Sequence, residues 1–199
     1  MPATYAQIYA LLLLLSAAAA GGLAVYAWRR RSAPGGLYFA LLMAAVAEWA
    51  AAGAAEALAT GLSAKVFFSK LSYVGICTVA PLWVLFALRY SGSDKQVPAR
   101  WKAALWAVPA LVILLAATNE WHGWIWPEIR RLTADPRSQL VYGHGWGVLL
   151  IAGYSYALTL LGSAWLVRAT LRSPRVFRLQ SSALATGAVL PIVVNALYV

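Results

Sequence analysis

Charged residues are scarce in this chain. Asp, Glu, Lys and Arg together make up 11% of its 199 residues, whereas soluble domains average about 25%. Hydrophobic residues make up 62%. This composition excludes an ordinary soluble domain and indicates a protein that crosses a membrane several times. Only helices or a closed barrel can cross a bilayer, and long apolar runs, rather than short alternating ones, favour helices.

Residues that carry common catalytic or metal chemistry are also few. The single cysteine, Cys77, excludes an intramolecular disulfide and a cysteine-based metal site. His122 and His144 lie in one connection without a clear carboxylate pattern, so we expect them to orient that loop by hydrogen bonds rather than to bind a metal or haem. The chain has no nucleophile motif, phosphate-binding loop or kinase phosphoacceptor site. We therefore predict no catalytic residue, no metal, no cofactor and no enzymatic activity in this chain.

The net charge of +10 is concentrated in alternate connections between the apolar segments. Basic residues cluster at 29–31, 89–102 and 168–178, which is typical of the cytoplasmic loops of a membrane protein. The other connections mix basic residues with acidic ones. This distribution predicts that the N-terminus lies outside, and it explains the positive charge without a nucleic-acid partner.

The apolar segments predict six membrane-spanning helices in a single all-α bundle that covers residues 1–199. These helices are expected at about 5–28, 37–59, 67–90, 101–118, 146–168 and 179–199. Pro109 is expected to kink the fourth helix. Residues 119–145 form the longest connection, on the outer side, where we expect a small cap or hairpin over the bundle.

The third apolar segment has an inner face with mixed chemistry. Its residues Lys70, Tyr73, Cys77, Pro81 and Val84 recur at spacings of three and four, so they share one face of a helix. A stripe that faces lipid has no need of an amine, a phenol, a thiol and a proline. We therefore expect this face to pack against other helices.

Four segments carry a family resemblance, namely KLSYVGICTVAPLWVLFALRYSG (70–92), TNEWHGWIW (118–126), the stretch 142–180 and GAVLPIVVNALYV (187–199). In this order they resemble the third helix, the outer loop, the fifth helix with its inner loop, and the sixth helix of one family. That family is the seven-helix membrane region at the N-terminus of bacterial sensor histidine kinases. The chain resembles this region truncated after the sixth helix, without the seventh helix and the cytoplasmic signalling domains.

The resemblance implies a sensor module in the cytoplasmic membrane of a bacterium. Such a module would bind a small ligand from outside and pass a conformational signal to a cytoplasmic kinase or similar output domain. It also implies a homodimer, formed through the kinase part. Two alternatives remain open, a small transporter or ion-path module and a stand-alone integral subunit of a larger membrane complex.

Polar and aromatic side chains are expected to converge in the outer half of the bundle. A carboxylate in the membrane costs roughly 2.5–3.5 kcal/mol on insertion scales, so Glu48, near mid-membrane, needs a partner or a task. Glu56 and Lys70 lie at the same depth on consecutive helices, so we expect them to form a charge pair. We predict an outward-opening pocket for a small amphipathic or aromatic molecule, lined by Glu48, Glu56, Lys70, Tyr73, Trp83, Tyr154 and Asn195. The alternative is that these side chains only tie the helices together.

Overall fold

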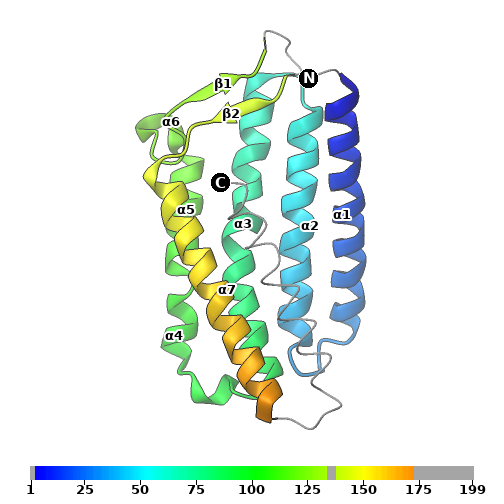
Figure 1. Cartoon of the computed structure of the whole chain (residues 1–199), viewed down its shortest axis with the longest axis vertical. Coiled ribbons are helices and arrows are strands. Elements are labelled where there is room, and N and C mark those ends of the chain that lie inside the picture. The colour runs from blue at the N-terminus through cyan, green and yellow to red at the C-terminus, as the bar shows by residue number, and fades with distance from the viewer. Residues whose placement is uncertain (1–2, 134–137, 173–199) are drawn as a thin grey trace.

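Long helices packed side by side make up most of the molecule (Figure 1). The computed structural model describes residues 3–133 and 138–172. Five segments of this part are long and apolar enough to cross a membrane. They are α1 (Ala3–Arg29), α2 (Gly36–Leu58), α3 (Leu62–Tyr90), the stretch Ala99–Ala117 and α7 (Trp146–Arg172). The predicted helical membrane bundle is confirmed, and the sixth span expected at 179–199 lies outside the described residues.

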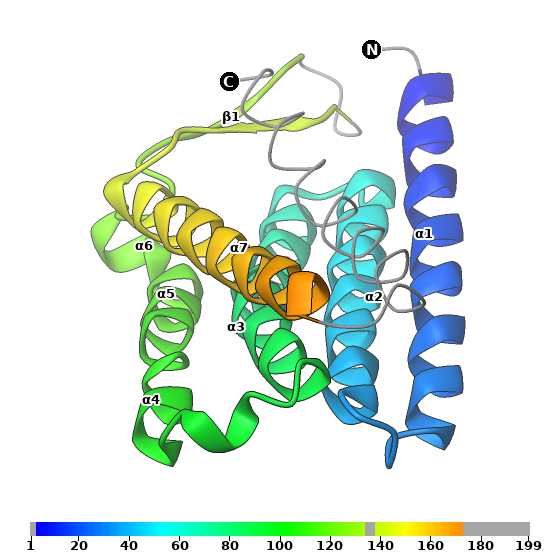
Figure 2. The ribbon, with the colours of Figure 1, turned by 60° about the horizontal axis from the view of Figure 1, so that its bottom comes forward.

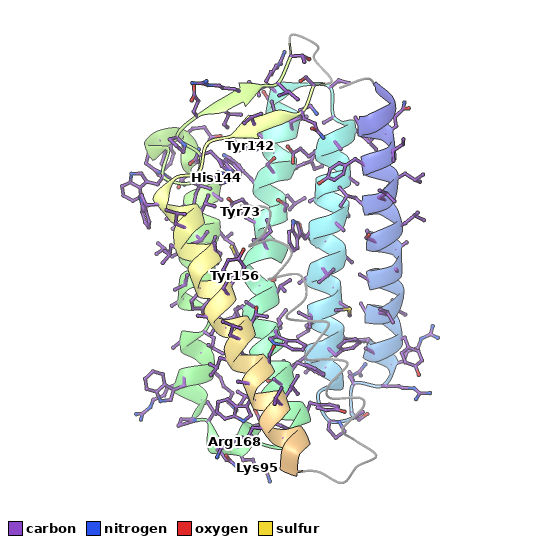
Figure 3. All side chains as sticks on the ribbon, in the orientation of Figure 1. Tyr73, Lys95, Tyr142, His144, Tyr156 and Arg168 are labelled. Carbon is purple, nitrogen blue, oxygen red and sulfur yellow. The ribbon has the colours of Figure 1, made fainter. Side chains whose placement is uncertain are left out.

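The two ends of the bundle differ in chemistry. One end, here called the hairpin end, holds the start of α1 and a pair of short strands (Figure 1). The other, here called the basic end, holds Arg29–Arg31, the connection 89–102 and the last turns of α7 with Arg168 (Figure 3). The basic clusters at 29–31 and 89–102 and Arg168 therefore meet at one end, as alternate loops of a bundle should.

Helix α3 is the central helix of the described bundle. In its most apolar stretch 72% of the residues are buried, against 11% for α1 and 28% for α2. It contacts α2, α5 and α7, whereas α1 packs on α2 at the edge (Figure 2). Tyr73, Cys77, Pro81 and Val84 are all buried, so the expected inner face of this helix does point into the protein.

Two glycines set how closely the neighbouring helices approach α3. A Cβ at Gly75 would come within 2.5 Å of the carbonyl oxygen of Ala45 on α2. A Cβ at Gly162 on α7 would lie 2.7 Å from Cδ1 of Trp83. Small residues allow such close contact between helices in a membrane. The contacts of α3 with α2 and with α7 therefore require glycine at these two positions.

The helix expected at 101–118 is in fact broken. It consists of α4 (Ala99–Ala104) and α5 (Ala107–Ala117), and a short 3-10 turn, η1 (Asp94–Gln96), precedes it. Pro109 lacks the N–H that would bond to the carbonyl of Leu105 four residues earlier. Tyr154 of α7 donates its hydroxyl to this carbonyl at 2.6 Å. The freed acceptor thus binds a neighbouring helix.

Two other helix boundaries differ from the expectation. Helix α3 begins at Leu62 rather than at 67. Lys65 therefore lies inside the helix, and because its side chain is only 2% exposed it does not mark the point where the chain meets water. The Lys65 Nζ donates to the Glu56 carbonyl oxygen at 3.0 Å, and this carbonyl lies in the last turn of α2, where acceptors lack partners within the helix. Helix α7 continues past the expected 168 to Arg172.

The connection 119–145 contains short regular elements of its own. A single helical turn, α6 (Asn119–His122), is followed by the strands β1 (Ile129–Arg131) and β2 (Leu140–Tyr142). The strands pair in antiparallel fashion, with Ile129 opposite Tyr142 and Arg131 opposite Leu140. The hairpin extends across the end of the bundle above α3 (Figures 1 and 2), which fits the expectation of a small cap or hairpin.

Candidate functional site

Asn119 holds the loop that follows α6 in a fixed shape. Its Oδ1 accepts hydrogen bonds from the backbone N–H groups of Ile125 and Trp126, each at 3.0 Å. Its Nδ2 donates to the Trp126 carbonyl oxygen, also at 3.0 Å. Gly123, with φ at +64°, allows the chain to turn sharply in between. Asn119 is buried, so all these bonds are shielded from water and fix the place of the Trp126 ring.

Trp126 forms an aromatic cluster with Tyr73 of α3 and Tyr142 of β2. Its ring lies 5.3 Å from the Tyr73 ring in an edge-on arrangement, and 4.9 Å from the Tyr142 ring. Such pairs contribute roughly 0.5–1.5 kcal/mol beyond the burial of their area. The cluster is continuous with the buried core formed by Cys77, Val112 and their neighbours, so the loop and the bundle share one core.

Tyr142 also links the hairpin to two helices through its hydroxyl. This hydroxyl donates to Oε1 of Glu56 on α2 at 2.8 Å and forms a short hydrogen bond with Oγ of Ser69 on α3. Burial raises the pKa of Tyr142, and the nearby Glu56 carboxylate raises it further, although the hydrogen bond with Ser69 acts the other way. The phenol therefore keeps its proton at neutral pH and remains the donor to Glu56.

Lys70 forms an ion pair with Glu120 rather than with Glu56. Its Nζ lies 2.5 Å from Oε1 and 2.6 Å from Oε2 of Glu120, and it also donates to the Ala117 carbonyl oxygen at 2.9 Å. The expected Glu56–Lys70 pair is thus wrong, because Tyr142 occupies the Glu56 carboxylate and α6 brings a nearer anion to Lys70. The hydrogen bonds from Lys70 lower the pKa of Glu120, so this carboxylate is ionised at neutral pH.

An open pocket of about 420 Å³ lies beside this ion pair at the hairpin end. Val66 and Lys70 of α3 form one side, and Glu120, Trp121 and His122 of α6 form another. Asn119, Trp126, Pro127 and Ile129 complete the lining. Trp121 is 86% exposed, so the pocket combines a cation, an anion and aromatic surface accessible to solvent. This combination suits a small ligand with a ring and a charged group.

The predicted site residues are only partly brought together. Lys70 lines the pocket. Tyr73 does not line it but packs on the lining residue Trp126, and Glu56 is linked to Trp126 through Tyr142. Trp83 packs on α7 instead, where its Nε1 donates to the Thr159 carbonyl oxygen at 3.3 Å. Tyr154 reaches the break between α4 and α5. Asn195 lies outside the described residues.

Glu48 occupies a separate position in the middle of the bundle. Both of its carboxylate oxygens are buried and have no hydrogen-bond partner among the described residues. A Cβ at Gly75 would lie 2.6 Å from Glu48 Oε2, so the carboxyl group is held at the close contact of α2 and α3. Glu48 is therefore not part of the pocket at the hairpin end.

The two histidines lie in the loop as expected, and neither belongs to a metal cluster in the described part of the chain. The Nε2 of His122 is 3.1 Å from Oγ1 of Thr118, and its Nδ1 accepts from the Trp124 backbone N–H at 2.9 Å. These bonds orient the turn that follows α6, which is the role expected for this histidine.

Several residues that shape the site were missed in the sequence. Glu120, Asn119, Ser69 and Tyr142 were not predicted, although they hold the ion pair and the aromatic cluster. The position of Asn119, between an apolar helix and a tryptophan-rich loop, is the sequence signal that indicates a side chain bonding to the backbone of that loop. No local pattern marks Tyr142, because its partner Glu56 lies 86 residues earlier in the chain.

Comparison with protein families identifies the chain. The model of a family described as the N-terminal 7TM region of histidine kinase matches residues 12–199. No curated protein and no solved structure matches the chain. The match covers nearly the whole chain, including the central helix and the ion pair of Lys70 and Glu120.

Proposed function

The chain belongs to the family of N-terminal 7TM regions of histidine kinases, and from this premise we propose that it binds a small ligand outside the membrane and passes the signal inward. It is a multi-pass membrane protein of a sensor family. We place it in the cytoplasmic membrane of a bacterium, with the hairpin end outside, because the basic end has the charge of cytoplasmic loops.

The observation that carries the proposal is the position of the Lys70–Glu120 ion pair in the pocket wall. Lys70 belongs to α3 and Glu120 to α6, so the pair joins the central helix to the loop. The side chain of Lys70 is 19% exposed and that of Glu120 is 61% exposed. A small amphipathic or aromatic molecule with a charged group would compete for one partner while its ring lies against Trp121 or Trp126.

Ligand binding would then shift α3 between two states. A ligand changes such an equilibrium only by its different affinity for the two states, and here the state with an intact ion pair is the one it would disfavour. Helix α3 runs without a break from Lys70 to Arg89 at the basic end. There Arg89 and Lys102 both bind the carboxylate of Asp94, at 3.2 and 2.9 Å. A tilt of α3 would therefore reach the connection 89–102, and a homodimeric kinase part would receive it.

A thermal-shift screen of the purified chain against amphipathic and aromatic metabolites tests this proposal. Among the screened compounds with an anionic group, which would take Lys70 as their partner, a true ligand should raise the melting temperature of the wild type but not of Lys70→Gln. The matched control is Arg130→Gln, which removes an exposed cation that pairs with Glu128 near the pocket but does not line it. A ligand that stabilises wild type and Lys70→Gln equally would place the site elsewhere.

A second candidate function, an ion path, has one observation in its favour. The Glu48 carboxyl group is buried without a hydrogen-bond partner among the described residues, and intramembrane carboxyl groups often mark proton or ion routes. Proton flux in proteoliposomes distinguishes the two functions. A sensor module should show no flux above that of empty liposomes, whereas flux that is lost in Glu48→Gln would support transport.

A further inference from the structure

A second concave surface lies along α3, on the side of the basic end, and shares no lining residue with the pocket at the hairpin end. It is a groove of about 500 Å³ with α3 as its floor, α2 as one wall and α4 with the following residues as the other. Leu82 and Leu85 form the deep part of the floor, and both are buried. Tyr38 lies on the α2 wall, while Lys102 and Trp106 lie on the α4 wall.

We propose that this groove binds one phospholipid with an anionic headgroup, its acyl chain along α3 and its phosphate at Lys102. Helix α7 covers another face of α3, where Trp83 bonds to Thr159, so among the described residues α7 does not close the groove. Large apolar side chains of the groove remain uncovered by the described residues, since Leu41 is 39% and Val74 is 41% exposed. An apolar occupant is therefore expected.

The length and the chemistry of the floor fit an acyl chain. From Val74 to Leu85 the helix rises by about 16 Å, which is close to the depth of one leaflet of a hydrocarbon core of about 30 Å. The hydroxyl on the floor belongs to Thr78, and it donates within its own helix to the Val74 carbonyl oxygen at 2.8 Å. This hydroxyl therefore needs no polar partner from the occupant.

The charge at the basic end of the groove selects the headgroup. The Nζ of Lys102 makes two hydrogen bonds to Asp94, at 2.9 Å to Oδ1 and at 3.3 Å to the backbone oxygen. An ammonium group has three donors, so one is left for a phosphate oxygen. Zwitterionic and anionic phospholipids both carry such an oxygen, so the selection between them comes from the net charge around the headgroup. The connection 89–102 holds four basic residues and only one acidic residue. Basic pockets between helices on the cytoplasmic side are suited to anionic lipid headgroups.

Native mass spectrometry of the full chain tests the proposal. The delipidated protein in detergent is titrated with phosphatidylglycerol or phosphatidylcholine of the same acyl chains. We expect one phosphatidylglycerol to bind with an affinity about fivefold higher than that of phosphatidylcholine, as one lysine near the headgroup contributes. Equal binding of the two lipids would overturn the headgroup assignment.

Two pairs of variants locate the site. Lys102→Gln should remove most of the preference for phosphatidylglycerol, whereas Arg100→Gln, the same charge change at an exposed residue of α4 outside the groove, should reduce it much less. Ala103→Trp should fill the groove and lower the retained phosphatidylglycerol several-fold. Ala104→Trp on the same helix is exposed and does not line the groove, so it should leave binding unchanged. Equal effects within either pair would contradict the proposal.

A measurement on the wild type covers the case in which a variant fails to fold. Phosphatidylglycerol with a photoreactive group in the acyl chain is cross-linked, and the labelled fragments are identified by mass spectrometry. Labels in the fragments that hold Leu82–Leu85 and Ala103–Trp106 support the groove. Labels spread over all the helices would overturn it. A dimer in the native mass spectra that is lost in Ala103→Trp, without any change in lipid binding, would assign the groove to a second copy of the chain instead.

Discussion

The two halves of α3 are held by different kinds of contact. Toward the hairpin end, polar side chains link it to its neighbours through Lys70–Glu120 and through Ser69, Tyr142 and Glu56. Around its middle, α3 packs mainly by shape, with Gly75 against α2 and Trp83 against Gly162 of α7. Its polar side-chain contacts there are fewer, namely the hydrogen bond from Trp83 to α7 and, at the basic end, the ion pair of Arg89 with Asp94. Polar links can be broken by a competing charge, whereas close packing responds mainly to volume. On the proposed sensor function, this contrast favours the hairpin end as the part that responds to a ligand.

The largest effect is expected from Gly75→Ala, in the half that packs by shape. The new Cβ would lie within 2.5 Å of the Ala45 carbonyl oxygen and 2.8 Å of Trp49 Cβ. Because the nearest contact is a backbone atom of α2, it cannot move aside as the end of a flexible side chain could. The free energy of unfolding should therefore fall by about 1–3 kcal/mol or more. Thermal denaturation in detergent measures it. The control is Gly22→Ala, where a Cβ would meet nothing within 4 Å, and an equal loss there would contradict the account.

Asn119→Ala should have the next largest effect, in the half held by polar contacts. It removes three hydrogen bonds to Ile125 and Trp126. The buried backbone groups left without partners should lower the free energy of unfolding by about 1–3 kcal/mol. Hydrogen exchange should rise over 123–126 and remain unchanged around Gly162. In Asn119→Asp, which keeps the two acceptor bonds, the rise should be smaller. Unchanged exchange in Asn119→Ala would show that the loop holds its shape without this side chain.

Tyr142→Phe should have a moderate effect. It keeps the ring against Trp126 but loses the hydrogen bonds with Glu56 and Ser69. This loss should lower the free energy of unfolding by about 1 kcal/mol. Glu56→Gln retains an acceptor for the Tyr142 hydroxyl and should cost less. The melting temperatures of the two variants test this order, and the reverse order would mean that the charge of Glu56 has a partner other than Tyr142.

The smallest effect is expected from the Lys70–Glu120 pair itself. Exposed ion pairs contribute about 0–1 kcal/mol, and Glu120 is 61% exposed. The pKa of Glu120 is lowered from 4.5, mainly by the hydrogen bonds from Lys70. Its contribution to stability is therefore complete above the unfolded pKa and is lost as the pH falls through the lower folded pKa.

A pH series of melting temperatures for wild type and Glu120→Gln checks this sign. The two proteins should differ by a constant small amount from neutral pH down to about the ordinary carboxyl range of Glu, and they should converge below it. A difference that grows as the pH falls would contradict the ion pair.

The sequence predicts the membrane helices well, because their length and apolar composition follow from the bilayer itself. It predicts the contacts of the site less well. The sequence puts Lys65 and Lys70 at the membrane boundary, yet Lys65 is buried against the end of α2 and Lys70 binds Glu120. Glu56 binds Tyr142 because the hairpin folds back over the bundle, and helical periodicity cannot predict a contact between residues so far apart in the sequence. Depth along the helices alone predicts Trp83 and Tyr154 at the site, but the Trp83 side chain binds α7 and the Tyr154 hydroxyl binds the Leu105 carbonyl oxygen.

The central claim, that the hairpin end carries the input site and faces outside, is tested most directly by cysteine labelling of intact cells. In a Cys77→Ser background, single cysteines replace Trp121 at the hairpin end and Lys95 at the basic end, both of which are exposed. A maleimide that does not cross membranes should label position 121 at once and position 95 only after the cells are permeabilised. Labelling of position 95 in intact cells, with position 121 protected, would contradict the account.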